Sequence, residues 1–352
     1  MAIERGLRMN WPPHMTGPRR MTRRLALQSG VALAGLPLQR TASADILDAP
    51  ECIVPAKVGG GFDLTCKLVG TLIAQHGKSS KPLRVNYLPG GIGAVAYDRV
   101  VTGRLPNMQA LIAFSGGSLL NLAQGKFGPH QASDVRWVAA VGTDYGAIAV
   151  PKDSGIRTLQ DLKLQLQRDL SRVVFGAGGT VGSQDWVKAA LIVKAAGLDH
   201  KGMRFVSFEG GGEAISALEG RHVTVFCGDA AEAFQAADAG ANIRVIAILS
   251  DKRVASKPNV PIGTEQGLNL VWPVIRGVYV GQAVSDADYR RWVDFFDAAM
   301  LQPEYAAIRQ QYGLSPFTMT GKLLTEFVEK EVVKYRELAQ SLGLRVPPPR
   351  RS

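Results

Sequence analysis

The stretch CIVPAKVGGGFDLTCKLVGTLIA, residues 52–74, contains the features that decide the fold. Its apolar start, 52–54, predicts a short buried strand, and three glycines, 59–61, follow. After Asp63 comes a helical pattern with one apolar face, made by Leu64, Leu68, Leu72 and Ile73. Glycines let the backbone approach a bound group, and the free N–H groups of a helix start attract anions. The stretch therefore predicts either a ligand-binding turn or a tight strand-to-helix turn without a ligand, with Asp63 as the helix N-cap.

Three other segments repeat this pattern: residues 86–93, 114–118 and 176–185. Each follows a short apolar run and is rich in glycine, serine or asparagine. In a parallel α/β sheet such turns lie at the carboxyl edge of the strands, where ligands bind. We therefore expect the four turns to lie near one another.

Apolar strand-like runs alternate with helical patterns along the whole chain. The predicted strands are 52–54, 83–86, 110–114, 137–142, 147–150, 172–176, 203–207, 223–226, 243–249 and 277–281. Helices are predicted between them, for example 184–196 and 213–219, each followed by a C-capping glycine. This alternation predicts an α/β protein with doubly wound, mainly parallel sheets flanked by helices.

The length of the chain predicts two domains, because about 300 residues exceed what one core usually reaches. Turn-rich segments follow Val150 and cover 250–261, where the chain can pass between domains. We expect a discontinuous first lobe, 45–149 plus 251–344, and a second lobe, 150–250. Residues 345–352 read as a disordered tail.

The N-terminus is predicted to be an export signal, residues 1–44. Arginines 19, 20, 23 and 24 precede a moderately apolar stretch, and Ala42-Ser43-Ala44 supplies a small-residue cleavage site after Ala44. Both the general and the twin-arginine routes fit, and Met21 is an alternative start. The alternative interpretation is a disordered arm.

Export also explains the charge of the chain, +11. Residues 1–44 contain seven arginines and one glutamate, and residues 345–352 contain three arginines, so the body between them carries only +2. This argues against a nucleic-acid partner.

The three cysteines, Cys52, Cys66 and Cys227, permit two interpretations. Cys52 and Cys66 flank one turn and could form a disulfide, or all three could be small buried residues. Their spacing does not indicate a metal site.

Several of these motifs resemble the tripartite tricarboxylate transporter receptors, also called the Bug family of periplasmic solute-binding proteins. The matching segments are PAKVGGGFD at 55–63, NYLPG at 86–90, the glycines 210–212 before a helix, and Gly228-Asp229 after a strand. The runs FDLTC at 62–66, GSQDW at 182–186 and FEGGGE at 208–213 are similar to the tricarboxylate-binding branch. Val58 departs from the family, which usually has proline there. The resemblance covers 45–344 and implies a two-lobed periplasmic-binding-protein-like (type II) fold with the ligand cleft between the lobes.

The resemblance also implies that a carboxylate is held largely by backbone amides, hydroxyls and waters. The predicted ligand-binding residues are Lys57, Gly60, Gly61, Phe62, Asp63, Ser115, Gly116, Ser118, Gly179, Thr180, Gly182, Ser183, Gly228, Asp229 and Arg276. We expect Asp63 and Asp229 to cap helices or to accept from ligand hydroxyls and water. Lys57 and Arg276 are the candidates for an ion pair with a polycarboxylate, and the alternative is that both are solvent-facing charges.

An enzyme is not predicted. No Gly-x-Ser-x-Gly, His-Glu-x-x-His or Cys-x-x-Cys motif occurs, and the five histidines are scattered. The first glycine loop lacks the spacing of a nucleotide site. No cofactor and no metal are expected.

The leading hypothesis is a monomeric periplasmic receptor that binds a di- or tricarboxylate such as citrate. It would close two lobes around the ligand and deliver it to a membrane permease of one large and one small subunit. The alternative is a ligand-sensing protein of the same fold that serves a signalling partner, and a secreted hydrolase is the weakest hypothesis.

Overall fold

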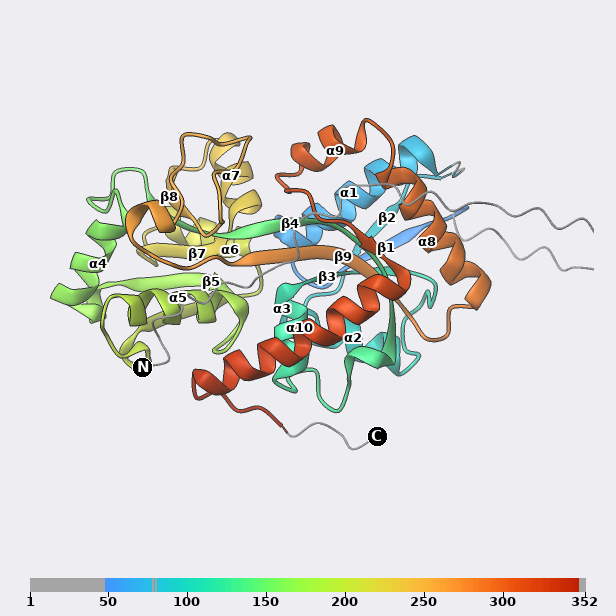
Figure 1. Cartoon of the computed structure of the whole chain (residues 1–352), viewed down its shortest axis with the longest axis horizontal. Helices are drawn as coiled ribbons and strands as arrows, with labels where there is room; N and C mark the ends of the chain where they lie inside the picture. Colours follow the sequence, from blue (N-terminus) through green and yellow to red (C-terminus); the bar gives the residue numbers. More distant parts are fainter. Residues whose placement is uncertain (1–47, 78, 80, 348–352) are drawn as a thin grey trace, which may run out of the picture.

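The computed structural model describes residues 48–77, 79 and 81–347. The predicted signal peptide with its cleavage site, and residues 348–352 of the predicted tail, lie outside the described residues. Two lobes lie side by side, with helices on both faces of a continuous, curled mixed sheet (Figure 1). The expected two-lobed α/β fold class is thus confirmed. Within the described residues, no helix combines the length and the apolar character that crossing a membrane requires.

The first lobe contains both ends of the described chain. Its elements are β1 (Glu51–Val54), α1 (Gly61–His76), β2 (Arg84–Tyr87), α2 (Ala94–Val101), β3 (Leu111–Ser115), α3 (Gly116–Ala123), β9 (Pro273–Gly281), α8 (Asp286–Met300), α9 (Tyr305–Gln311), β10 (Met319–Thr320) and α10 (Gly321–Ser341). The second lobe contains α4 (Leu159–Arg168), β5 (Val174–Gly178), α5 (Gln184–Ala195), β6 (Arg204–Phe208), α6 (Gly211–Glu219), β7 (Val225–Asp229), α7 (Ala230–Asp238) and β8 (Ile243–Ile248). The strand β4 (Val135–Pro151) belongs to both.

The strands follow the order β2-β1-β3-β9-β4-β7-β5-β6, and β8 and β10 also pair with β4. Within β2-β1-β3 and within β7-β5-β6 the strands are parallel, whereas β4 and β9 run antiparallel to their neighbours. Each of the strands β1, β3, β5 and β7 is followed in the chain by the helix of the same number. Helices that follow strands in this way begin at the carboxyl ends of the strands, so several helix starts come to one region.

The strand β4 corrects one prediction. Segments 137–142 and 147–150 were expected as separate strands, but the chain between them stays extended and buried. Tyr145 pairs with Pro273 of β9, and the next residue, Gly146, pairs with Asp229 of β7. One strand thus passes from the first lobe to the second without a turn, and the lobe boundaries at 149–150 and 250–251 stay predictions.

Several strands end later than the apolar pattern predicted, and their last residues are polar or glycine. β3 ends at Ser115, β5 at Gly178 and β7 at Asp229. The backbone pairing of a strand continues past the last apolar side chain, so hydrophobicity alone misses these positions. They are also the positions nearest the candidate site described below.

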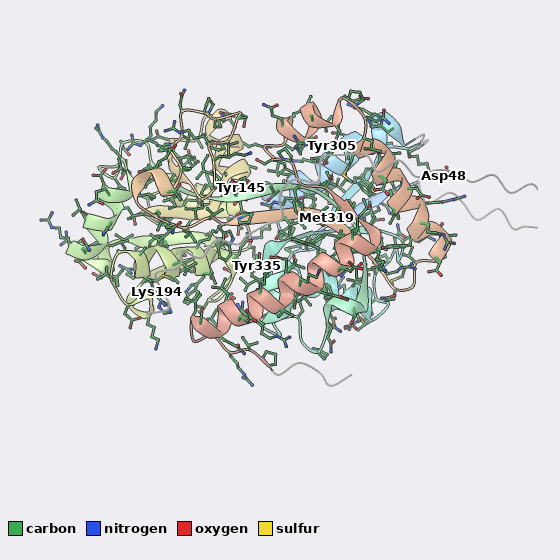
Figure 2. The ribbon with its side chains drawn as sticks, viewed as in Figure 1. Asp48, Tyr145, Lys194, Tyr305, Met319 and Tyr335 are labelled. Carbon is green, nitrogen blue, oxygen red and sulfur yellow. A yellow bond between two sulfur atoms is a disulfide. The ribbon has the colours of Figure 1, made fainter. Side chains whose placement is uncertain are left out.

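The longest helix, α10, packs across the first lobe and against α3. Tyr335 on α10 and Tyr145 on β4 both lie near the junction of the lobes (Figure 2). A Cβ atom at Gly116 would lie 2.8 Å from the Tyr335 hydroxyl oxygen, so glycine at this position serves the packing of α10 on α3.

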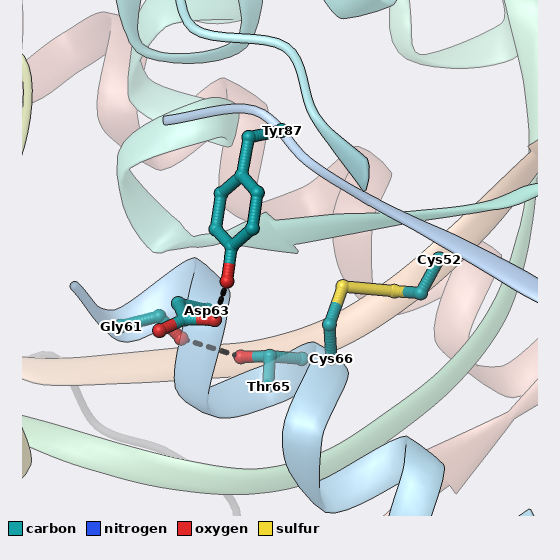
Figure 3. Close-up of a disulfide and its surroundings, with 6 residues drawn as sticks. All are labelled: Cys52, Gly61, Asp63, Thr65, Cys66 and Tyr87. Carbon is teal, nitrogen blue, oxygen red and sulfur yellow. Dashed lines mark hydrogen bonds between the residues drawn. A yellow bond between two sulfur atoms is a disulfide. The ribbon is translucent and has the colours of Figure 1, made fainter. Parts of the chain in front are cut away.

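Cys52 and Cys66 form a disulfide, which resolves the two interpretations left open by the sequence (Figure 3). It links β1 to the second turn of α1 across a Cα–Cα distance of 5.8 Å, and Cys227 is free and buried. The glycine turn lies between the two cysteines in the chain. The disulfide therefore closes a covalent loop around this turn.

We expect the Cys52→Ser/Cys66→Ser double variant to be less stable by about 3 kcal/mol, the chain-entropy value for a loop of about 15 residues. Urea unfolding of the oxidised wild type and the variant measures the difference. Dithiothreitol should lower the midpoint of the wild type and leave that of the variant unchanged. Equal midpoints for the two oxidised proteins would mean that the link adds no stability.

Candidate functional site

A small cavity of about 50 Å³ lies between the lobes, among the starts of the helices that follow the glycine-rich turns. Seven of the predicted residues line it: Gly60, Gly61, Phe62, Ser115, Ser183, Asp229 and Arg276. The four turns predicted to meet each contribute a lining residue, since Ile92 comes from the second turn and Gly178 from the fourth. The predicted turns thus meet at this cavity, and their role in ligand binding stays a prediction.

Eight predicted residues do not line the cavity: Lys57, Asp63, Gly116, Ser118, Gly179, Thr180, Gly182 and Gly228. Most of them shape the turns. Ser118 Oγ accepts a hydrogen bond from Ser115 N, Gly182 O accepts one from Gln124 Nε2, and Gly228 O accepts one from Lys188 Nζ. Thr180 O accepts one from Ser183 N. Gly179 has a φ of +81°, and a Cβ there would lie 3.2 Å from Ile92 Cγ1.

Asp63 is the third residue of α1 and not its N-cap, which is Gly60. Its buried carboxylate accepts from Gly59 N at 3.0 Å and from the Tyr87 hydroxyl at 2.8 Å, and pairs with Lys67 at 2.8 Å (Figure 3 shows the Tyr87 contact). Asp63 thus stabilises the conformation of the glycine turn through these three contacts. Its carboxylate does not line the cavity, so it is not placed to contact a ligand there.

Sequence reasoning missed eleven lining residues: Ala56, Ile92, Gly117, Asn121, Gly178, Gln184, Asp185, Glu209, Gly210, Gly211 and Glu232. Five of them lie inside the second, third and fourth predicted turns, and Gly210 and Gly211 belong to the glycine run 210–212. Glu232 had a detectable signal, because Asp229-x-x-Glu232 is the spacing of a capping box. Ile92 lies in the predicted turn 86–93, but its left-handed backbone, φ +49°, is rare for a β-branched residue and has no sequence signal.

Two of the helices that begin at the cavity have no side-chain cap. They are α1, with N-cap Gly60, and α6, with N-cap Gly210. By contrast, Ser115 caps α3, Ser183 caps α5, and Asp229 with Glu232 makes a capping box on α7. The N–H groups of the first turns of α1 and α6 are therefore the donors still available for an anion.

These two uncapped starts come from opposite lobes and touch each other. A Cβ atom at Gly212 would lie 3.2 Å from Val58 O, and one at Gly60 would lie 3.6 Å from Gly211 N. Beside them, Lys57 Nζ and Glu213 Oε1 form an ion pair at 2.6 Å, with both side chains partly exposed. Lys57 therefore links the lobes at the rim, and the prediction that it contacts the ligand is not supported by its position.

Behind the cavity lies a buried charge network centred on Asp229. Its Oδ2 pairs with Arg276 Nη2 at 2.7 Å, and its Oδ1 pairs with Lys188 Nζ at 2.8 Å. Gln184 Nε2 also donates to both oxygens. Arg276 reaches Asp144 Oδ2 at 3.3 Å, and Lys188 reaches Asp185 Oδ1 at 2.8 Å. The network joins β9 of the first lobe to β7 and α5 of the second.

Arg276 is buried, with 3% of its surface exposed, so it is not a solvent-facing charge. It lines the cavity, but its Nη2 is already held by two carboxylates. Its Nε has no hydrogen-bond partner among the described residues. The predicted role as a dedicated partner of a ligand carboxylate is therefore corrected: Arg276 first neutralises the cavity wall, and only its remaining N–H groups can face a ligand.

The pKa values of the network follow from burial and from the two cations. Burial acts to raise the pKa of Asp229, but Lys188 and Arg276 outweigh it and lower this pKa. Burial raises the pKa of Asp144 and of Asp185 to about 6, despite Arg276 and Lys188. Asp229 therefore remains ionised. Asp144 and Asp185 are weaker ion-pair partners of Arg276 and Lys188 than Asp229 is.

Two amide oxygens at the cavity also have no partner within the described part of the chain: Asn121 Oδ1 and Gln184 Oε1. The orientation of the Gln184 amide follows from chemistry, since its Nε2 must face the Asp229 carboxylate. The cavity thus presents unused acceptors as well as unused backbone donors. A ligand with both hydroxyl and carboxylate groups would satisfy both sets.

A larger open hollow of about 590 Å³ lies elsewhere on the first lobe, between α2 and the segment 126–130. Its charges are mostly engaged: Asp98 pairs with Arg104 and His130, and Lys126 Nζ donates to Val181 O. We assign the candidate site to the smaller cavity, because buried polar atoms without partners are found there.

Gly61→Ala tests why the third glycine of the turn is required. A Cβ at Gly61 would lie 2.1–2.2 Å from the Arg276 guanidinium atoms, so alanine must displace Arg276 from its carboxylates. We expect a loss of several kcal/mol in unfolding free energy, measured by urea denaturation, because a buried ion pair is broken.

Gly155→Ala is the matched control, since a Cβ at this exposed-loop position has open space around it. It should change stability by well under 1 kcal/mol. Equal effects at the two positions would contradict the proposed contact between Gly61 and Arg276.

Arg276→Gln should also destabilise the fold before it affects any ligand. It leaves Asp144 and Asp229 without this cation in a buried site, which costs about 3–5 kcal/mol. Arg253→Gln, which breaks the exposed pair with Glu265, should cost less than about 1 kcal/mol. Thermal and urea unfolding of both variants measure these losses. An Arg276→Gln variant as stable as the wild type would contradict the proposed stabilising role of the buried charge network.

The chain is similar in sequence to one protein family and in fold to several solved structures. The family described as the tripartite tricarboxylate transporter family receptor matches residues 124–344. Among solved structures, BugD has a TM-score of 0.74 at 17% identity, over 84% of this chain and 98% of that one. MatC from Rhodopseudomonas palustris with bound malate has a TM-score of 0.70 at 19% identity, over 82% and 98%.

A third structure, an R. palustris protein with adipate, has a TM-score of 0.75 at 17% identity, over 84% of this chain and 98% of that one. No curated protein matches the chain. At these identities the solved structures show the fold alone, and the family match, which covers more than half of the chain, shows the family. The chain belongs to the tripartite tricarboxylate transporter receptor family.

Proposed function

We propose that this protein is a non-enzymatic receptor that captures a small carboxylate between its lobes and delivers it to a membrane permease. One observation carries the proposal: two uncapped helix starts, from opposite lobes, face the same cavity. Backbone N–H groups at a helix start carry partial positive charge and bind anions without needing a dedicated lysine. Membership of the receptor family supports the same role.

The ligand carboxylate would lie against the first turns of α1 and α6. Their donors belong to Gly61 and Phe62 on one side and to Gly211 and Gly212 on the other. Because each helix belongs to a different lobe, an anion between them favours the closed arrangement by differential affinity. The unused acceptors of Asn121 and Gln184 would receive ligand hydroxyl groups.

The charges of the cavity favour ligands with few carboxylates. Four acidic residues line it, Asp185, Glu209, Asp229 and Glu232, against one lining cation, Arg276. A tricarboxylate would bring three negative charges toward this wall, and each added like charge raises the energy of the complex. We therefore propose a dicarboxylate or hydroxy-dicarboxylate as the ligand. Citrate, our first prediction, is expected to bind more weakly.

Ligand entry requires the lobes to separate. The cavity of about 50 Å³ has room for about one or two water molecules, since a water occupies about 30 Å³ in the liquid. Some contacts between the lobes lie at the exposed rim, such as the Lys57–Glu213 ion pair and the hydrogen bond from Lys126 Nζ to Val181 O. Such contacts can break and reform at small cost, as a closing cleft needs.

The remaining parts of the proposal come from the family. MatC and the R. palustris relative are solved with malate and with adipate, both dicarboxylates. We propose that the chain is exported to the periplasm, is cleaved after Ala44 and acts as a monomer. It would deliver its ligand to a permease of one large and one small subunit. The lobe limits 45–149 plus 251–344 and 150–250 belong to the same proposal.

A thermal-shift panel on residues 45–352 tests the ligand class. We expect malate, succinate or adipate to stabilise the protein, because a ligand at a hundred times its dissociation constant adds about 2.7 kcal/mol. Citrate should give a smaller shift, and matched diamides of the same length should give none. Stabilisation by the diamides and not by the acids would contradict the carboxylate proposal.

A further inference from the structure

One carboxyl group of the cavity has no role in the network described above. Glu232, on the first turn of α7, is 6% exposed and lines the cavity. A Cβ atom at Gly211 would lie 2.2 Å from its carboxyl carbon and from both oxygens. Its Oε2 would lie 3.6 Å from a Cβ at Gly60. The Glu232 carboxyl group therefore lies between the uncapped starts of α1 and α6, beside the position expected for the ligand carboxylate.

Glu232 has no countercharge of its own. In the described part of the chain no cation lies within ion-pair distance of it, and its one hydrogen bond is from Asp229 N to Oε1, at 3.2 Å. Two cations lie nearby, but Arg276 is held by Asp144 and Asp229, and Lys188 by Asp185 and Asp229. The other charge that faces the cavity is Glu209, which is also acidic.

This environment favours the neutral form of Glu232. Burial, with the negative charges of Asp229 and Asp185, raises its pKa to about 8, although Arg276 and the hydrogen bond from Asp229 N act to lower it. A neutral carboxylic acid has an O–H donor, whereas an ionised one has acceptors only. Since Oε1 already accepts from Asp229 N, the proton belongs on Oε2, the oxygen nearer Gly60.

We propose that Glu232 acts as a protonated carboxylic acid that donates its Oε2 hydrogen to the ligand carboxylate, so that capture of the ligand requires this proton. The inference rests on the proposed function, because it takes a carboxylate as the ligand. It adds a specificity-determining residue: an ionised glutamate at this point would repel the ligand that the helix starts attract.

The sign of the pH effect follows from linkage. A second carboxylate beside Glu232 makes its ionisation still harder, so the bound state holds the proton to higher pH than the free state. Above about pH 8 the free protein has lost the proton and must take one up to bind. The dissociation constant should then rise up to about tenfold per pH unit. The ligand adds no titration of its own, because free carboxylic acids ionise near pH 4.

Isothermal titration calorimetry with malate, or with adipate if malate gives no thermal shift, tests the proposal between about pH 6 and pH 9.5. Buffers with different ionisation enthalpies give the number of protons exchanged. We expect uptake approaching one proton per ligand at the alkaline end, and an affinity that falls there. Glu232→Gln, whose amide is a permanent donor, should show no uptake and should bind more tightly than the wild type at the alkaline end.

Three further variants test whether the pH dependence of binding arises from Glu232. Glu232→Leu removes both the donor and the ionisable group, so it should weaken binding below about pH 8 and show no proton uptake, while circular dichroism verifies that the variant is folded. Glu329→Gln, an exposed glutamate on α10, should keep the wild-type profile. Lys126→Arg is needed because burial lowers the pKa of Lys126 to about 8, in the same pH window, and it should also keep the profile.

The outcomes separate the two proposals. If no carboxylate of the panel binds, the proposed function fails and this inference with it. If malate or adipate binds with a flat pH profile, or if Glu232→Gln keeps the wild-type slope, the inference alone is overturned. Proton release, with an affinity that rises with pH, would also overturn it, because the complex would then hold fewer protons than the free protein.

Discussion

The Asp229 carboxylate, held between Lys188 and Arg276, is the interaction on which the rest of the site depends. Asp229 ends β7 and starts α7, so its position fixes both elements. Through Lys188 it holds α5, and through Arg276 it holds β9 of the other lobe. A charge this deeply buried remains ionised only because two cations face it. Removing either cation would change the protonation of the whole cluster.

Two sequence requirements follow from this arrangement. Arg276 lies against the backbone of Gly61, where any side chain would collide with the guanidinium, and the Lys188 side chain passes 2.7 Å from the Cβ position of Gly146 on β4. Glycine at these positions makes room for the cations. The same charge also keeps Glu232 neutral, since burial and the neighbouring Asp229 both oppose a second ionised carboxylate. One ion pair thus determines the start of α1, the course of β4 and the chemistry of the cavity wall.

The fold class and most of the order of strands and helices could be predicted, because they depend on local patterns, and seven of the predicted residues line the candidate cavity. Hydrophobic periodicity located β1 and α1, and the glycine turns marked the strand ends that meet at the cavity. What could not be predicted depends on contacts between distant residues. Arg276 reads as a surface or ligand charge until Asp144 and Asp229 are seen beside it. Glu232 had the spacing of a capping box, but its burial depends on Gly211 at the start of α6 and on Gly60 before α1, which are distant in sequence.

The central claim is that a carboxylate binds between the uncapped starts of α1 and α6. A crystal structure of residues 45–352 with malate or adipate, whichever stabilises the protein, tests this most directly. The account predicts one ligand carboxylate within hydrogen-bond distance of the N–H groups of residues 61–62 and 211–212, with Glu232 Oε2 as a further neighbour. A ligand carboxylate bound elsewhere, such as in the hollow at Arg99 and Lys126, would contradict it.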